Sequence, residues 1–417
     1  MLDHEARVGR FRRMLTVAAI AVGLFMALGF CTLYLINGMT SLAVKGGGAR
    51  GSSVAQFGGS ADRIEAVPTD IATNCSTDIT NRLNSWLATV PDGATIMFAK
   101  GGCYRLDRTL EISHRNNLMF EGNGATLKRE TPTPPELLNY NPPSLLNPSR
   151  LLNKHVFISN SKNIVIRNIA IVGLNTVSGV DPNSVRGKTV YEPAKFGGDA
   201  GRLNPGTTTR DKEGESGISI IGSDNINLTH VKIDAIYGDG ISLGNDNAPV
   251  SRNITIKDVD IDRNGRQGVA FLAVQNVRVD NTRILHSYGG GFDLEPNGLY
   301  SIVKGVEIRD SYVNSYSVAF GLAGANDVSD INIHNNMVRN TLYSYPWFNG
   351  INGNKYAGVG RANWRIIDNT SLSMSSGIKV HNVRNVAIAG NRQVTAIDFP
   401  GVELINVEGE VSIKGNM

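Results

Sequence analysis

The chain has 417 residues, of which 41% are hydrophobic and 19% are charged, and its formal net charge is +4. Several basic residues precede the first apolar run, so the remainder is near neutral and nucleic-acid binding has no electrostatic support. The 46 glycines exceed the usual fraction of about 7%. Such an excess is expected of a chain that makes many tight turns.

The N-terminal region predicts a membrane anchor. Residues 1–14 form a basic tail, and 22 uncharged residues follow at 15–36, enough to cross a hydrocarbon core of about 30 Å. The preceding arginines place the tail in the cytoplasm and residues 68–417 outside as one extracytoplasmic domain. Residues 37–67, rich in Gly and Ser, read as a flexible linker. A cleaved signal peptide, and hence secretion, is the alternative, although its apolar region would normally be shorter.

Two cysteines lie beyond the predicted membrane span, where oxidation is permitted. A disulfide between Cys75 and Cys103 would close a loop of about 28 residues and stabilise the domain by on the order of 3 kcal/mol. Between them, apolar residues at Ile79, Leu83 and Leu87 recur with a helical period. We therefore expect a short amphipathic helix that caps the open end of the fold that follows.

The fold that follows is predicted from a repeat of roughly 22–29 residues, which is most regular from Asn225 to Asn297. Short runs that begin with Asn alternate with short runs that begin with Gly, and apolar residues occupy every second position of each run. Such a pattern is typical of a β-solenoid, in which each coil stacks only on its neighbours. A doubly wound parallel sheet would need helices between its strands, and the gaps show no helical period.

Aligning the Asn runs predicts one column of turn residues on successive coils. Stacked coils lie about 4.8 Å apart, so the column can form a side-chain hydrogen-bond ladder. Its members are Asn168, His230, Asp258, Asn281, Asp310 and Asn335.

The segments PDGATIMFAKGGCYRLDRTLEI and NNLMFEGNGATL, with GDGISL, GRQGVAF and GFDLEPN later, resemble the coils of bacterial pectate-lyase-like right-handed parallel β-helices. The resemblance covers roughly residues 75–417 and implies an all-β fold of that handedness. It implies no single activity, because the superfamily includes lyases, hydrolases, epimerases and non-catalytic adhesins. The chain lacks the Asp-Asp and Gly-His-Gly motifs of polygalacturonases and the Asp-Pro-His motif of alginate epimerases.

The candidate site is where the repeat breaks. In GGGFDLEPN, Phe292 and Leu294 belong inside, so Asp293 and Glu295 point outward on one face. Two carboxylates at this spacing, roughly 7 Å apart, suit acid–base work on a sugar or the binding of a cation such as Ca²⁺. The aligned runs place small residues, Ser242 and Ala270, beneath Asp293.

Neighbouring coils add further polar groups. Asp239 and His286 join the carboxylate pair as candidate catalytic residues, with Arg266 supplying a positive charge. The remaining candidate substrate-binding residues are Arg263, Gln267, Tyr288 and, on an aromatic loop where it offers a stacking surface, Trp347. Structural alternatives stay open: Asp239 as a turn cap, the arginines as partners of the carboxylates, His286 as a turn residue, and Trp347 as packing.

Two functions remain after this reading. The first is a membrane-anchored enzyme of the lyase, hydrolase or epimerase type that acts on a polysaccharide through outward carboxylates. The second is a non-catalytic module that binds glycan or supports the envelope. A trimeric phage-type spike is disfavoured because a coiled-coil heptad is absent, and we expect a monomer.

Overall fold

The structure is a computed structural model that describes residues 63–131, 154–174, 215–245, 248–287, 289–298, 301–324, 326–340, 346–350, 360–372, 377–394 and 401–416. The predicted tail and membrane span, together with residues 37–62 of the linker, lie outside these ranges. Within them, no helix has the length and apolar character needed to cross a membrane.

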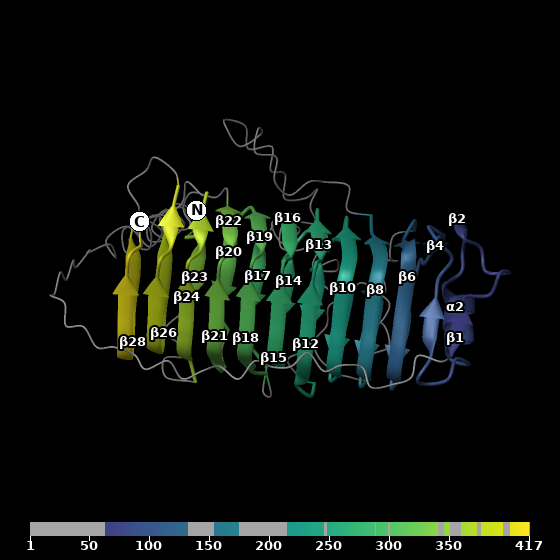
Figure 1. The fold of residues 1–417 in the computed structure, drawn as a ribbon, viewed down its shortest axis with the longest axis horizontal. Coiled ribbons are helices and arrows are strands. Elements are labelled where there is room, and N and C mark those ends of the chain that lie inside the picture. The colour runs from purple at the N-terminus through teal and green to yellow at the C-terminus, as the bar shows by residue number, and fades with distance from the viewer. Residues whose placement is uncertain are drawn as a thin grey trace, which may run out of the picture. The chain divides into compact units, whose positions relative to one another are not determined.

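The described strands pair in parallel with the coil before and the coil after, and they form three stacks (Figure 1). Period-2 alternation in the sequence produces this arrangement, because it supplies each strand with one face for the interior and one for the surface. The predicted all-β parallel β-helix is therefore confirmed.

The first stack contains the longest strands and runs the whole length of the described solenoid. Its members are β1 (Ile64–Ala66), β3 (Thr95–Met97), β6 (Asn116–Lys128), β8 (Lys162–Val172), β10 (Asp224–Asp234), β12 (Ser251–Lys257), β15 (Val274–Asp280), β18 (Val303–Arg309), β21 (Val328–His334), β24 (Ala362–Ile367), β26 (Ile378–Ala389) and β28 (Val402–Lys414).

The second stack follows each strand of the first around one turn, and it includes the second halves of β6, β8 and β10. Its other members are β2 (Asn74–Asp78), β4 (Cys103–Arg105), β13 (Asp260–Asp262), β16 (Arg283–Ser287), β19 (Tyr312–Ser315), β22 (Met337–Asn340), β25 (Thr370–Ser371) and β27 (Arg392–Gln393).

The third stack carries the candidate site, and the beginnings of β26 and β28 extend it. Its members are β5 (Leu110–Ser113), β7 (Lys154–Ser159), β9 (Ser216–Ile221), β11 (Ile241–Leu243), β14 (Val269–Phe271), β17 (Gly290–Leu294), β20 (Val318–Leu322) and β23 (Phe348–Gly350).

The N-terminal end of the solenoid is closed by helix α2 (Thr80–Leu87), as predicted. Leu83 and Leu87 are buried and belong to the same hydrophobic core as the first coils. One boundary was wrong: the linker was expected to extend to residue 67, yet β1 already pairs with β3 within it. The reason is that Ile64–Ala66 adds an outer strand to the first coil, although it is too short to show a period.

The predicted disulfide between Cys75 and Cys103 is confirmed, with the two Cα atoms 5.0 Å apart. It joins β2 to β4, which are neighbours in the second stack. The bond therefore ties the capping region to the first coil.

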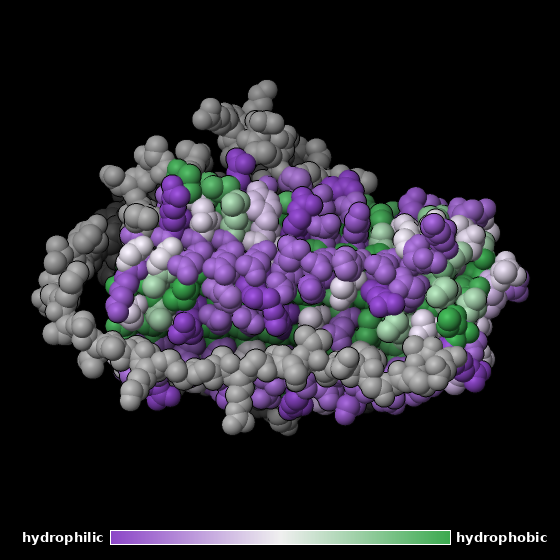
Figure 2. Space-filling view, in the orientation of Figure 1, coloured by the Kyte–Doolittle hydropathy of each residue, from purple (hydrophilic) through white to green (hydrophobic). Residues whose placement is uncertain are grey.

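Turns between the first and second stacks lie in the predicted column. All six predicted residues have left-handed backbone conformations, with φ between 47° and 57°. Asn, Asp and His tolerate this region better than other side chains, which explains the composition of the column. One rung of the predicted ladder is a direct hydrogen bond, in which Asn281 Nδ2 donates to Asp258 Oδ1 at 2.6 Å. Figure 2 shows mainly hydrophilic residues along the middle of this side of the solenoid.

Candidate functional site

The third stack brings the predicted carboxylates to its outer face. In β17, Phe292 and Leu294 are fully buried, whereas Asp293 and Glu295, the residue directly after the strand, are partly exposed. The predicted orientation of the pair is thus confirmed. Beneath β17, an aromatic ladder fixes the strand, because Phe292 stacks on Phe320 with ring centroids 5.5 Å apart.

Register defines the neighbours of Asp293 along the stack. The column of outward residues at its level is, in coil order, Ser219, Ser242, Ala270, Asp293, Gly321 and Asn349. Ser242 and Ala270 lie on the N-terminal side, as the aligned repeats predicted. Asp293 therefore has small or neutral residues on the coils next to it, whereas charged residues follow farther along the column, at Glu111 toward the N-terminus and at Lys379 and Glu403 toward the C-terminus.

Three residues predicted from adjacent coils converge on this column. Asp239 is buried, and its Oδ1 lies 3.6 Å from Arg266 Nη1. The backbone N–H of Gln267 donates to the same Oδ1 at 3.2 Å, while Gln267 Nε2 donates to Asp293 Oδ2 at 3.1 Å. Gln267 thus links the two carboxylates, a contact that crosses coils and has no sequence signal.

The electrostatics of Asp293 differ from those of an ordinary surface carboxylate. Burial of the carboxyl among protein atoms, followed by repulsion from Glu295 and Asp239, raises the pKa of Asp293 well above its usual range, and Arg266 offsets part of the effect. A hydrogen bond between Asp293 and Glu295 acts in the same direction. A carboxyl group whose charged form is disfavoured in this way can hold a proton and donate it.

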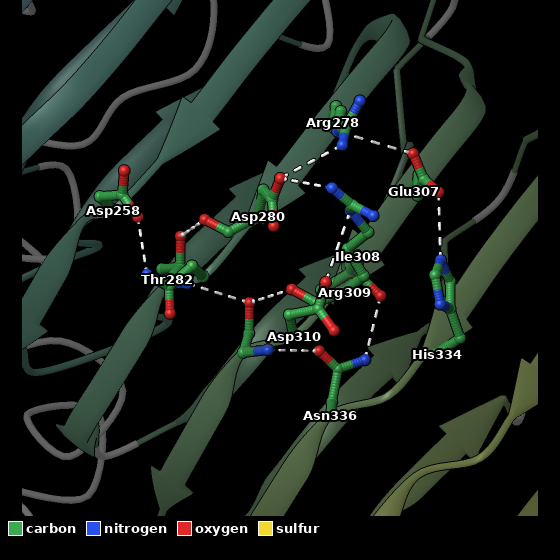
Figure 3. A network of polar contacts seen from close by, with 12 residues as sticks. Asp258, Arg278, Asp280, Thr282, Glu307, Ile308, Arg309, Asp310, His334 and Asn336 are labelled. Atoms are coloured by element: carbon green, nitrogen blue, oxygen red, sulfur yellow. Dashed lines mark hydrogen bonds and ion pairs between the residues drawn. The ribbon is translucent and has the colours of Figure 1, made fainter. Parts of the chain in front are cut away.

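A second polar cluster on the solenoid shows the contrasting case (Figure 3). On β15 and β18, Asp280 Oδ2 lies 3.2 Å from Arg278 Nη2 and 2.7 Å from Arg309 Nη2. These cations outweigh burial and lower the pKa of Asp280. His334 Nε2 extends the network to Glu307 Oε1 at 3.1 Å. A carboxylate held between two guanidinium groups is a structural ion pair, so this cluster does not compete as a proton donor.

Two predicted residues have structural partners of their own. His286 has a left-handed φ of 52°, and its Nδ1 lies 2.7 Å from Asp262 Oδ1. Arg263 Nε donates to Asp234 Oδ1 at 2.7 Å. Both side chains lie at the ends of second-stack strands, and within the described residues neither has a hydrogen bond to Asp293 or Glu295. Tyr288 lies outside the described residues.

The prediction that Trp347 offers a stacking surface for sugars was wrong. Its side chain is fully buried, and its ring packs edge-on against Phe320 at 6.4 Å and Phe348 at 6.2 Å. Trp347 pairs with Ala319 next to the buried aromatic ladder. A side chain of this size in the core contributes packing and has no face for a ligand.

A buried charged group near β7 and β9 was not predicted. Glu215 Oε1 lies 3.2 Å from His155 Nε2, and Glu215 Oε2 lies 3.8 Å from Arg129 Nη1. Burial, followed by the charge of Arg129, lowers the pKa of His155. The group adjoins the site through the backbone, because Gly217 N donates to the carbonyl oxygen of Asp239 at 3.1 Å. No periodic feature of the sequence marks these residues.

The sequence reasoning also missed Gly321 and Asn349, which continue the Asp293 column toward the C-terminus. Aligning SVAFGLA with GGGFDLEPN would have placed Gly321 beside Asp293. With regard to metals, the described residues contain no group of three or more His, Cys, Asp or Glu side chains arranged to hold an ion.

The stacked parallel coils define the class of protein, a parallel β-helix. A family model described as right handed beta helix region matches residues 216–345, which include the candidate site. This match and the observed coils confirm the predicted resemblance at the level of fold. A search of curated protein sequences gave no significant match.

Solved structures with similar coils have diverse roles. An alginate lyase from Paenibacillus sp. str. FPU-7 is 14% identical, with 84% of this chain and 99% of that chain covered at a TM-score of 0.49. A family 28 exopolygalacturonase from Yersinia enterocolitica is 12% identical, with 85% of this chain and 78% of that chain covered at a TM-score of 0.48. A surface adhesin of Streptococcus pneumoniae is 10% identical, with 83% of this chain and 95% of that chain covered at a TM-score of 0.46.

Proposed function

We propose that the β-helix acts on a polysaccharide through the carboxyl groups on its third stack. Asp293 donates a proton to the oxygen of the bond being broken. The carboxylates of Glu295 and Asp239 provide negative charge and a group that accepts a proton. The observation that carries the proposal is the environment of Asp293, where burial and the adjacent Glu295 raise the pKa of its carboxyl group well above the usual range. Paired carboxyl groups with separated proton affinities are the usual means of acid–base chemistry on sugars.

The location proposed for this activity is outside the cytoplasm, with residues 15–36 as a membrane anchor and residues 1–14 in the cytoplasm. The Cys75–Cys103 disulfide supports this location, because such bonds persist in oxidising compartments. The polysaccharide is the expected partner, and we keep the expectation of a monomer.

The test is turnover of a glycan panel by the full-length protein and by Asp293→Asn and Glu295→Gln. Both substitutions keep the shape of the side chain and remove its acid–base function, and we expect a loss of about 10²-fold or more in kcat. Glu307→Gln is the control, because Glu307 is an outward carboxylate paired with His334 in a different stack. Unchanged turnover in both site variants would refute the catalytic role. Binding of a glycan without turnover by the parent protein would favour the non-catalytic module instead.

A further inference from the structure

The two oxygens of the Asp293 carboxyl group have different surroundings. Oδ2 accepts the hydrogen bond from Gln267 on the N-terminal side of the column. Oδ1 is directed toward Gly321 on the other side, where a Cβ atom added to the glycine would lie 3.0 Å from it. Asp293 is thus held by one coil and presents its second oxygen toward the next.

The glycine at this position is not required by the backbone. Gly321 is absent from the residues with left-handed φ, and beyond Asp293 the nearest atoms to an added Cβ would be 3.7 Å and 3.8 Å away. Gly291 in β17 is different, because a Cβ there would lie 2.3 Å from Val313. The missing side chain at Gly321 therefore leaves the side of Asp293 Oδ1 that faces the next coil without a covering Cβ, while Glu295 hydrogen-bonds the same carboxyl group.

The residue that follows Gly321 in the column is polar. Asn349 follows Gly321 in the column, so it lies two strand spacings, or about 9.6 Å, from Asp293. Its Oδ1 is buried and has no hydrogen-bond partner within the described part of the chain. An unsatisfied buried acceptor costs about 1–3 kcal/mol, and a hydroxyl group of a ligand would satisfy it.

The charge of the site selects against an acidic ligand. Among the described residues that touch one another here, three side chains are acidic, Asp239, Asp293 and Glu295, and one is basic, Arg266. Lys379, which follows Asn349 in the column, is paired with Glu403 at 3.3 Å. Arg266 is also committed to Asp239. A uronate carboxylate beside Asp293 would meet net negative charge in a partly desolvated place, which is unfavourable.

We propose that an uncharged sugar ring of a neutral polysaccharide binds over Gly321, between Asp293 and Asn349, with its glycosidic oxygen at Asp293 Oδ1. This subsite rests on the proposed function and gives it a substrate class. Elimination and C5 epimerisation both require a carboxylate at C5 of the sugar, so a neutral ring leaves hydrolysis as the reaction. The proton of Asp293 moves to the glycosidic oxygen as its bond to the anomeric carbon breaks. Water adds its oxygen to that carbon and gives a proton to Glu295, from which it returns to Asp293.

The experiment measures kcat/KM of the full-length protein on two panels, neutral oligosaccharides (xylo-, cello- and manno-series) and uronates (oligogalacturonate and oligomannuronate). We expect turnover of a neutral series to saturated products. Gly321→Val should lower kcat/KM by about 10²-fold, because a side chain there displaces the ring from Asp293. Ala387→Val, which creates the same side chain at an outward position of β26, should leave kcat/KM unchanged, and thermal unfolding should be similar for both variants.

The outcomes separate this inference from the function on which it rests. Preferred turnover of uronates, or full activity of Gly321→Val while Asp293→Asn is inactive, would overturn the neutral subsite and leave the acid–base function standing. Full activity of Asp293→Asn and Glu295→Gln would overturn both. If the parent protein neither turns over nor binds any glycan of the two panels, both proposals are overturned as well.

Discussion

The turns that follow β15, β18, β21, β24 and β26 contain a buried side-chain ladder whose removal should be measurable. Asn369 is fully buried, and its Oδ1 accepts hydrogen bonds from the backbone N and the Nδ2 of Asn336, both at 3.0 Å. Its Nδ2 donates to the carbonyl oxygen of Ile333 and to Asn391 Oδ1, also at 3.0 Å. Asn369→Ala removes all four bonds.

Three of the partner groups keep another bond and one loses its bond. Asn336 Nδ2 still donates to the carbonyl of Ile308, and Asn391 Oδ1 still accepts from the backbone N of Asn369. The carbonyl of Ile333 remains in the parallel ladder between β21 and β24, whereas the N–H of Asn336 loses the acceptor that the Asn369 side chain supplied. Because one unsatisfied buried group costs about 1–3 kcal/mol, the free energy of unfolding should fall by about 1–3 kcal/mol.

Urea unfolding followed by circular dichroism measures this change. Asn369→Ser should be intermediate, because Ser311 occupies the same position one ladder step before Asn336 and bonds through its hydroxyl group. Asn332→Ala is the control: the side chain is partly exposed, and we expect a change within about 0.5 kcal/mol. A loss for Asn369→Ala as small as that of the control would refute the ladder as a source of stability.

Three further predictions concern the site and its scaffold. The pKa of Asp293 is raised in the folded protein, so its contribution to stability is present at low pH and is lost as pH rises from about 3.9 through the folded pKa. Asp293→Asn should therefore unfold at a higher temperature than the parent at pH 7 but not at pH 3. Equal Tm values of variant and parent at both pH values would contradict this. Replacing Cys75 and Cys103 by Ser should cost about 3.5 kcal/mol in urea unfolding, whereas an unchanged midpoint would show that the bond does not constrain the unfolded chain. Trp347→Ala should lower the free energy of unfolding by about 3–5 kcal/mol, since the ring fills the core; a variant of parental stability that had lost only glycan affinity would restore the stacking role.

The coil architecture could be read from the sequence because it depends on local rules. Alternation of apolar residues assigns each strand an inner and an outer face, and residues that tolerate left-handed backbone mark the turns, so the column from Asn168 to Asn335 was placed correctly. The outward direction of Asp293 follows from the same rule. The disulfide was within reach because only two cysteines lie beyond the predicted membrane span.

Contacts between coils were decided by the tertiary structure. Whether Arg263 faces Asp293 or Asp234, and whether His286 faces the site or Asp262, depends on side-chain rotamers and on coils of unequal length. The burial of Trp347 depends on the aromatic ladder of preceding coils, which a single segment cannot reveal. Alternation along one strand thus determined which side chains reach the surface. The stacking of coils at about 4.8 Å decided which of them meet, so that Gln267 bonds one oxygen of Asp293 and Gly321 lies beside the other.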